Sequence, residues 1–250
     1  MENRENPATE WLCWGSNRMI EALPKAVVLV SGGMDSCVTA AMARETHRLA
    51  FVHASYGQLT ERRERQAFDA IADFYGVSER LVVSLDYFKQ IGGSALTDRG
   101  IGVPEDGAGT APSGPIPPTY VPFRNAHFLS VSVSWAEVLG ATAVFIGAVA
   151  EDSSGYPDCR PEYYHAFEDL ARIGTRPETR IRIATPVIGM RKSEIVRRGI
   201  ELGAPLDLTW SCYQGDDVAC GVCDSCRLRL AAFGEAGVTD PIPYQDRVAR

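Results

Sequence analysis

The chain has 250 residues, of which 45% are hydrophobic and 23% are charged, and this ordinary globular usage excludes a wholly disordered protein. Its 25 basic and 32 acidic residues give a net charge of −7, which argues against a protein that binds nucleic-acid phosphates. No apolar run reaches the roughly 18–20 residues of a membrane span, and the polar start at residues 1–7 shows no secretory signal. We therefore expect a soluble, cytoplasmic protein with neither a membrane nor a nucleic acid as its partner.

Predicted strands and helices alternate along the chain from residue 26 onward. In chain order they are strand 26–30, helix 34–48, strand 49–54, helix 61–75, strand 80–85, a helix ending near 139, strand 143–147, helix 162–174, strand 180–185 and helix 193–203. This alternation favours parallel strands, because parallel neighbours are joined by long crossovers that are usually helical. The expected fold is α/β, a Rossmann-like parallel sheet with helices on both faces.

We expect three regions. Residues 1–24 show no clear period and form an N-terminal extension, residues 25–205 carry the alternating elements, and residues 206–250 hold a cysteine cluster and a short helical tail. Within the main domain, 12 of the 27 residues in 92–118 are Gly or Pro, so no regular element is expected there. A loop of this length inside a compact domain is functional or disordered.

A phosphate-binding loop is predicted between the first strand and the first helix. The sequence there is Ser31-Gly32-Gly33-Met34-Asp35-Ser36. A strand-to-helix turn directs free backbone N–H groups and the positive end of the helix dipole at one point, which suits an anion. Glycine permits a positive φ and the serines add hydroxyl donors. The alternative is an ordinary glycine-rich turn capped by serine.

The residue pattern of this loop narrows the classes of nucleotide-binding loop to which it can belong. It lacks both G-x-x-x-x-G-K-[ST] and G-x-G-x-x-G. It resembles the loop of the ATP pyrophosphatases, which hold the β- and γ-phosphates as a leaving group while a carbonyl oxygen attacks the α-phosphate. That resemblance implies activation of a substrate with release of AMP, in a fold of the adenine nucleotide alpha hydrolase type.

Four of the seven cysteines lie within 15 residues. Their spacing is Cys212-x7-Cys220-x2-Cys223-x2-Cys226, which brings four thiolates within reach of one tetrahedral Zn²⁺. Four thiolates leave no open coordination position, so the expected zinc is structural. A redox C-x-x-C pair and an iron–sulfur cluster are the alternatives. Cys13 and Cys37 are interpreted as inert or buried thiols.

The stretch from about residue 25 to 244 resembles the 7-cyano-7-deazaguanine synthase family, the QueC-type enzymes of queuosine biosynthesis. The motifs that carry this resemblance are V-S-G-G-M-D-S at 30–36, Y-G-Q at 56–58, T-Y-V-P-F-R-N at 119–125, S-G-Y-P-D-C-R-P at 154–161, T-W-S-C-Y at 209–213 and C-G-V-C-D-S-C at 220–226. The sequence departs from the family at Met34, where relatives carry glutamine or leucine, and at Phe123, where many carry glycine.

The resemblance implies an ATP-dependent ligase that converts 7-carboxy-7-deazaguanine and ammonia to the nitrile. The carboxylate is adenylated and ammonia displaces AMP to give an amide; the amide oxygen is then adenylated, and AMP leaves as the nitrile forms. It also implies a homodimer, zinc at the four clustered cysteines and ATP at the loop. The implied nucleotide-binding residues are Val30, Ser31, Gly32, Gly33, Met34, Asp35, Ser36 and Cys37.

Roles for the loop residues follow from their chemistry. The main-chain amides of Gly32, Gly33 and Met34 and the hydroxyls of Ser31 and Ser36 are expected to stabilise the charge on departing pyrophosphate. Asp35, together with Asp152, is a candidate ligand for Mg²⁺, because this ion prefers oxygen donors.

Substrate recognition is assigned to residues of the second half of the domain. Arg124 and Arg160 are candidate guanidinium clamps for the carboxylate or the α-phosphate. Asp158 is a candidate acceptor for the amine edge of the deazaguanine, and Tyr156 or Phe123 for stacking on its ring. For each of these the alternative is a surface ion pair or a packing aromatic. Cys159 is left open between a nucleophile and a structural or binding residue.

No room for a glutaminase domain is left in 250 residues, so free ammonium or a partner protein is the expected nitrogen source. Three other functions stay open. The chain could activate a tRNA base for sulfur or amine insertion, could be a zinc-ribbon interaction module on an inactive fold, or could join activated deazaguanine to another amine. The net charge argues against the first, and the intact loop argues against the second.

Overall fold

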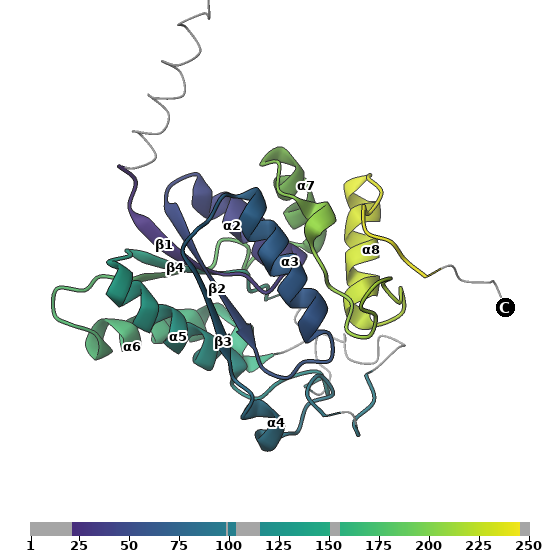
Figure 1. The fold of residues 1–250 in the computed structure, drawn as a ribbon, viewed down its shortest axis with the longest axis horizontal. Helices are drawn as coiled ribbons and strands as arrows, with labels where there is room; N and C mark the ends of the chain where they lie inside the picture. The colour runs from purple at the N-terminus through teal and green to yellow at the C-terminus, as the bar shows by residue number, and fades with distance from the viewer. Residues whose placement is uncertain (1–21, 99, 104–115, 151–155, 246–250) are drawn as a thin grey trace, which may run out of the picture.

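A single five-stranded sheet organises the protein (Figure 1). The computed structural model describes residues 22–98, 100–103, 116–150 and 156–245, so most of the expected N-terminal extension, Cys13 and Asp152 lie outside the described residues. The strands are β1 (Lys25–Leu29), β2 (Arg48–Ser55), β3 (Arg80–Ser84), β4 (Ala143–Ile146) and β5 (Arg182–Ala184). Their order is β3-β2-β1-β4-β5, and every pair is parallel, as predicted.

Helices cover both faces of the sheet, and this prediction is also confirmed. The helices are α2 (Met34–Arg44), α3 (Glu61–Phe74), α4 (Phe88–Ile91), α5 (Arg124–Leu139), α6 (Pro161–Gly174), α7 (Lys192–Glu201) and α8 (Asp224–Ala236), with short 3-10 turns at Pro157–Cys159 and Leu206–Leu208. Helices α2 and α3 lie on one face, and α5 and α6 lie on the other (Figure 1).

Alternate residues of β1 account for this arrangement. Val27 faces α5, whereas Val28 faces α2 and α3, and both side chains are fully buried. Because side chains alternate along a strand, a central parallel strand must be apolar at every position. The unbroken run of apolar residues near the start of the chain is therefore the central strand of the sheet.

Beyond α2, the C-terminal helices form a further layer. Val38 of α2 packs against Ile195 of α7, and Phe233 of α8 belongs to the same buried cluster. The four-cysteine segment runs into α8, which begins at Asp224, so Cys226 is already part of the helix. From the sequence we expected the cysteine cluster to end before the helical tail begins. In the structure the two overlap, because Cys226, the last of the four cysteines, lies in α8.

Two boundary findings concern the connections. The first helix ends at Arg44 instead of continuing to 48, because Arg48 enters the sheet, where its N–H donates to the carbonyl of Pro24. The described parts of 92–118 contain no helix or strand, as the density of Gly and Pro predicts.

No helix within the described ranges is long and apolar enough to cross a bilayer.

The strand order creates a crevice beside β1. The chain leaves β1 for β2 on one side, and β4 later pairs with β1 on the other side, so the connections after β1 and β4 diverge. Open parallel sheets bind ligands at such a switch point, at the carboxyl ends of the strands. Here Gly147, directly after β4, approaches α2 so closely that an added Cβ would lie 2.8 Å from the backbone carbon of Asp35.

Candidate functional site

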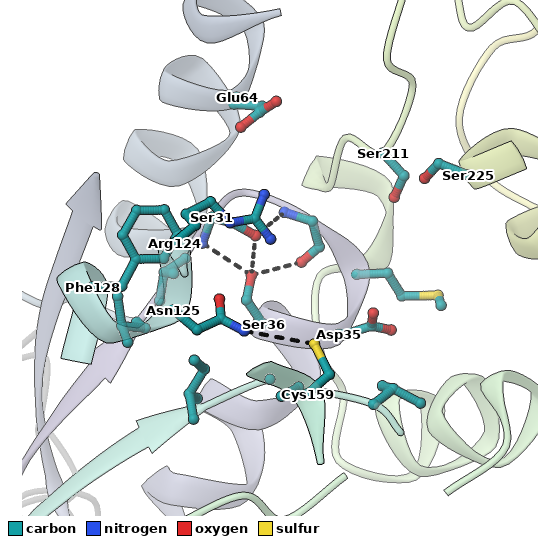
Figure 2. Close-up of a pocket in the computed structure, with 18 of the residues that line it drawn as sticks. Ser31, Asp35, Ser36, Glu64, Arg124, Asn125, Phe128, Cys159, Ser211 and Ser225 are labelled. Atoms are coloured by element: carbon teal, nitrogen blue, oxygen red, sulfur yellow. Dashed lines mark hydrogen bonds between the residues drawn. The ribbon is translucent and has the colours of Figure 1, made fainter. Parts of the chain in front are cut away.

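A cavity of about 310 Å³ opens at this switch point (Figure 2). Its floor contains Leu29 and Ile146, the last residues of β1 and β4. The phosphate loop and the start of α5 form further walls, and residues 210–213 and 224–229 of the C-terminal region close it. Three segments far apart in the sequence therefore meet at one cavity.

The phosphate loop is closed by its own hydrogen bonds. The Ser31 N–H donates to Ser36 Oγ at 3.2 Å, the Gly33 N–H donates to Ser31 Oγ at 3.2 Å, and Ser36 Oγ donates to the Gly33 carbonyl at 2.8 Å. Gly32 has φ of +92°, and an added Cβ would lie 2.6 Å from the carbonyl oxygen of Glu64. The loop is thus held in one shape at the N-terminus of α2, where the helix dipole favours an anion.

Asp35 carries a free oxygen at the cavity wall. Its Oδ2 pairs with Lys192 Nζ at 2.5 Å, whereas Oδ1 is buried and has no hydrogen-bond partner among the described residues. Both residues line the cavity. A buried carboxylate oxygen without a donor is a suitable ligand for a hard cation such as Mg²⁺.

On the opposite wall, Arg124 is held by aromatic rings. Its Nη1 donates to the Tyr56 hydroxyl at 3.0 Å, and its guanidinium carbon lies 5.2 Å from the centre of the Tyr56 ring and 5.5 Å from that of Phe128. The Arg124 Nε is buried with no partner in the described part of the chain. Burial raises the pKa of Tyr56 to about 12, so its hydroxyl stays protonated beside the guanidinium.

A carboxylate that the sequence did not single out, Glu64 of α3, also lines the cavity. Its Oε2 accepts a hydrogen bond from Gln58 Nε2 at 3.0 Å, and its Oε1 accepts one from Thr60 Oγ1 at 2.9 Å. Removal of water by the surrounding protein raises the pKa of Glu64 to about 7, although both hydrogen bonds act in the opposite direction. Figure 2 draws this carboxylate above Arg124 and Ser31.

The structure brings most of the predicted site residues together at the cavity. Those that line it are Val30, Ser31, Gly33, Met34, Asp35, Ser36, Arg124 and Tyr156. Two members of the predicted nucleotide loop stand behind it. Gly32 packs against α3, and Cys37 faces the core, where its Sγ lies 3.9 Å from the Pro205 carbonyl oxygen. Burial raises the pKa of Cys37 to about 12, as expected of an inert thiol.

Three predicted substrate residues lie beside the cavity without lining it. Asp158 is buried and accepts a hydrogen bond from the Asn125 N–H at 3.1 Å. Arg160 is exposed and forms the N-cap of α6. Phe123 is 59% exposed and has φ of +58°, a left-handed conformation that disfavours a bulky side chain. Cys159 does line the cavity and accepts from Asn125 Nδ2 at 3.6 Å.

The four clustered cysteines form a candidate metal centre. Their Sγ atoms all lie within 4.8 Å of one another, and all four residues are buried. Tetrahedral zinc with bonds of ~2.3 Å places sulfur atoms ~3.8 Å apart, close to the 3.9 Å between Cys220 and Cys226. The N–H groups of Gly215 and Cys220 point at Cys212 Sγ from 3.1 and 3.3 Å, which favours a thiolate. The donor set therefore fits a closed tetrahedral metal site.

This metal centre is linked directly to the phosphate loop. The Trp210 N–H donates to the Gly32 carbonyl at 2.8 Å, and its indole N–H donates to the Gly215 carbonyl at 3.0 Å. Deeper in the fold, Arg229 of α8 pairs with Asp240 through contacts of 2.7 and 2.9 Å, and both side chains are 2% exposed. The C-terminal region thus carries the cysteines and also stabilises the cavity wall, through the hydrogen bond from Trp210 to Gly32.

Several cavity residues had no distinct signal in the sequence. Glu64 lies on a helix rich in charge, where a solvated face is the ordinary interpretation, and Lys192 lies 157 residues from its partner Asp35. Tyr56 and Trp210 stand out in the sequence only as members of the motifs Y-G-Q and T-W-S-C-Y. Lys192 offered one clue, because it is one of only three lysines in the chain.

Comparison with known proteins agrees with this site. The family model described as "Queuosine biosynthesis protein QueC" matches residues 25–237. Proteins named 7-cyano-7-deazaguanine synthase are 58% identical to the chain in Koribacter versatilis, Acidobacterium capsulatum and Chlorobium phaeobacteroides. These alignments cover 89–90% of this chain and 95–98% of the relatives. The chain belongs to the QueC family of queuosine biosynthesis proteins.

Proposed function

We propose that the chain is an ATP-dependent ligase that converts 7-carboxy-7-deazaguanine and ammonia to 7-cyano-7-deazaguanine, releasing AMP and pyrophosphate. One observation carries the proposal within this family. A closed anion loop at the N-terminus of α2 and the half-buried Arg124 at the N-terminus of α5 face the same cavity. Such an arrangement suits a reaction that joins a substrate carboxylate to a nucleotide phosphate.

In the first half of the reaction, a carboxylate oxygen attacks the α-phosphate of ATP, and pyrophosphate leaves. The amides at the start of α2 and the hydroxyls of Ser31 and Ser36 stabilise the charge that develops on the leaving group. Arg124 orients the carboxylate through its guanidinium N–H groups, including Nε, which has no partner among the described residues. Ammonia then displaces AMP from the adenylated carboxyl group to form the amide.

The second half repeats the activation on the amide oxygen. AMP then leaves with that oxygen, and loss of the nitrogen protons gives the nitrile. The same loop and the same guanidinium serve both halves, because the attacking substrate oxygen and the leaving pyrophosphate are chemically alike in each. One cavity of about 310 Å³ therefore suffices for the reacting ends of both substrates.

Two metal ions complete the proposed site. Mg²⁺ would be held by Asp35, whose Oδ1 has no partner in the described residues, and would neutralise phosphate charge. Asp152, the second proposed ligand, lies outside the described residues. Zn²⁺ at Cys212, Cys220, Cys223 and Cys226 would be structural and would stabilise the wall that includes Trp210.

Recognition of the deazaguanine is proposed for Tyr156, Asp158, Arg160 and Phe123. Tyr156 is supported by its place on the cavity wall, where its hydroxyl pairs with Thr119 Oγ1 at 2.6 Å. For the other three, the support is indirect, because their neighbours Arg124, Asn125 and Cys159 line the cavity. Movement of these short segments on binding would bring them to the substrate.

The remaining proposals concern supply and assembly. We propose free ammonium or a partner protein as the nitrogen source, a homodimeric assembly, no nucleic-acid partner and a cytoplasmic location. A reducing compartment suits the four thiols of the metal centre, none of which forms a disulfide with another described residue. The acidic net charge of −7 supports the absence of a nucleic-acid partner.

Product analysis tests the proposed function. The metal-loaded chain is incubated with 7-carboxy-7-deazaguanine, ATP, Mg²⁺ and ammonium, and the products are identified by mass spectrometry. We expect the nitrile together with AMP. An amide that accumulates without nitrile would indicate another final acceptor. Absence of AMP, combined with salt-sensitive binding of bulk tRNA, would support tRNA-base activation instead.

A further inference from the structure

Glu64 is a half-buried acid that the reaction as described above does not use. It lies on the first turn of α3, and the backbone of that turn touches the phosphate loop at Gly32. Two neutral donors, Gln58 and Thr60, hold its two carboxylate oxygens, and no cation pairs with it within 4.0 Å in the described residues. The carboxylate is therefore fixed at the cavity wall without being neutralised by an ion pair.

Charged and polar groups from three elements surround Glu64. Arg124 of α5 attracts the carboxylate, Glu61 of α3 repels it, and the Tyr56 hydroxyl after β2 faces the same space. Loss of water outweighs these effects and raises the pKa of Glu64 to about 7. An acid with such a pKa exchanges its proton readily near neutral pH, which is the requirement for general acid–base work.

The reaction needs a proton acceptor at this place. When ammonia attacks the adenylated carboxyl carbon, a C–N bond forms and the nitrogen becomes positively charged. The C–O bond to AMP breaks, and AMP leaves with the electron pair. One N–H proton must leave the nitrogen to give the neutral amide, and departing AMP, with a second phosphate pKa of ~6, is a weaker base for that proton than a carboxylate with a pKa of about 7.

We propose that Glu64 is the general base that accepts this proton from the attacking ammonia. The proposal rests on the proposed ligase function. The carboxylate takes one proton as the C–N bond forms, becomes a neutral carboxylic acid, and returns the proton to solvent before the next activation. Glu64 lines the same cavity as the loop that holds the departing phosphates and as Arg124, which orients the carboxyl group, and it lies above both in Figure 2, which suits this role.

Separate assays of the two steps test the proposal. Glu64→Gln keeps the shape of the side chain but removes the base, and Glu61→Gln removes the same charge one turn away, outside the cavity lining. The first step is followed by exchange of labelled pyrophosphate into ATP without ammonia. The second is followed by amide and nitrile formation at a fixed concentration of free ammonia across pH 5.5–8.5.

For Glu64→Gln we expect pyrophosphate exchange within about twofold of the parent chain and product formation about 10²- to 10⁴-fold slower. The parent rate should fall as the pH drops below about 7, because a protonated Glu64 cannot accept a proton, and the variant should lose this dependence. Glu61→Gln should form product at close to the parent rate and keep the acidic limb of the profile, moved to lower pH because a charge that repels Glu64 is gone. Glu64→Asp should restore part of the rate.

Two results would overturn the proposal. In the first, Glu64→Gln slows pyrophosphate exchange as much as product formation, which indicates a purely structural role at the loop. In the second, it forms product at the parent rate or keeps the acidic limb of the pH profile. Failure of the proposed function itself is distinct, since the parent chain would then show neither pyrophosphate exchange nor AMP.

Discussion

The buried pair of Arg229 and Asp240 should be a main support of the C-terminal region. Both side chains are 2% exposed, and the pair is bidentate, with contacts of 2.7 and 2.9 Å. The remaining donors of Arg229 reach Thr209 Oγ1 at 2.7 Å and the Leu206 carbonyl at 3.1 Å, and Asp240 also accepts from the Tyr244 hydroxyl at 2.6 Å. Asp240→Asn keeps the shape of the side chain and removes its charge, which leaves a buried guanidinium without its counter-ion.

Loss of one partner of a buried pair costs about 3–5 kcal/mol, because the other charge stays buried. For a chain of this length, ~2–4 °C per kcal/mol converts that loss to a fall of roughly 6–20 °C in melting temperature. The matched control is Asp169→Asn, whose partner Arg172 is 62% exposed while Asp169 is 73% exposed. An exposed pair contributes under about 1 kcal/mol, so this control should melt within a few degrees of the parent chain.

The assay is thermal unfolding of the metal-loaded chain followed by circular dichroism. The double variant Arg229→Met/Asp240→Leu should melt above Asp240→Asn, because it leaves no buried charge unpaired. If Asp240→Asn melted within about 2 °C of the parent chain, or no lower than Asp169→Asn, the structural importance given to this pair would be refuted.

Three further predictions follow from the same structure. Removal of the metal from the cysteine cluster by chelation should lower the melting temperature, and an unchanged melt with the metal demonstrably gone would contradict this. Gly32→Ala should weaken ATP binding at least tenfold in calorimetry, because an added Cβ would lie 2.6 Å from the Glu64 carbonyl oxygen. The control is Gly76→Ala, which should bind ATP normally, because Gly76 has a similar positive φ of +64° but open space around it. Phe123→Gly should be about 1 kcal/mol more stable than Phe123→Ala in urea unfolding, since only glycine adopts φ of +58° without strain; equal stability would contradict it.

Local signals in the sequence were sufficient for the main architecture. Buried strands such as β1 are apolar at every position, and their alternation with helices leaves a parallel sheet as the consistent solution. The phosphate loop was also predictable, because it depends on residues adjacent in the chain. The same holds for the cysteines, three of which lie within seven residues.

Contacts between distant segments could not be predicted in the same way. The pairing of Asp35 with Lys192 and the approach of Glu64 to Arg124 depend on how α2, α3, α5 and α7 pack around the switch point. Trp210 illustrates the same limit, since its bond to Gly32 joins the C-terminal region to the first loop. Nothing in the local pattern near any of these residues specifies its partner.

The left-handed conformation of Phe123 is a further case. The family resemblance indicates that Phe123 stands where many relatives carry glycine. Its φ of +58° supplies a physical reason for glycine at that position. The conformation itself arises from the turn into α5, where the Phe123 N–H donates to the Tyr120 hydroxyl at 2.9 Å. The left-handed conformation of Phe123 could therefore be recognised only in the folded structure.

Isotope transfer tests the central claim, activation of a substrate oxygen at the α-phosphate, most directly. The substrate is 7-carboxy-7-deazaguanine with both carboxylate oxygens replaced by ¹⁸O, and the AMP released during nitrile formation is analysed by mass spectrometry. We predict two AMP molecules per nitrile, each carrying one ¹⁸O atom, because each activation transfers one substrate oxygen to the α-phosphate. Unlabelled AMP, or label recovered in inorganic phosphate together with ADP, would contradict the mechanism.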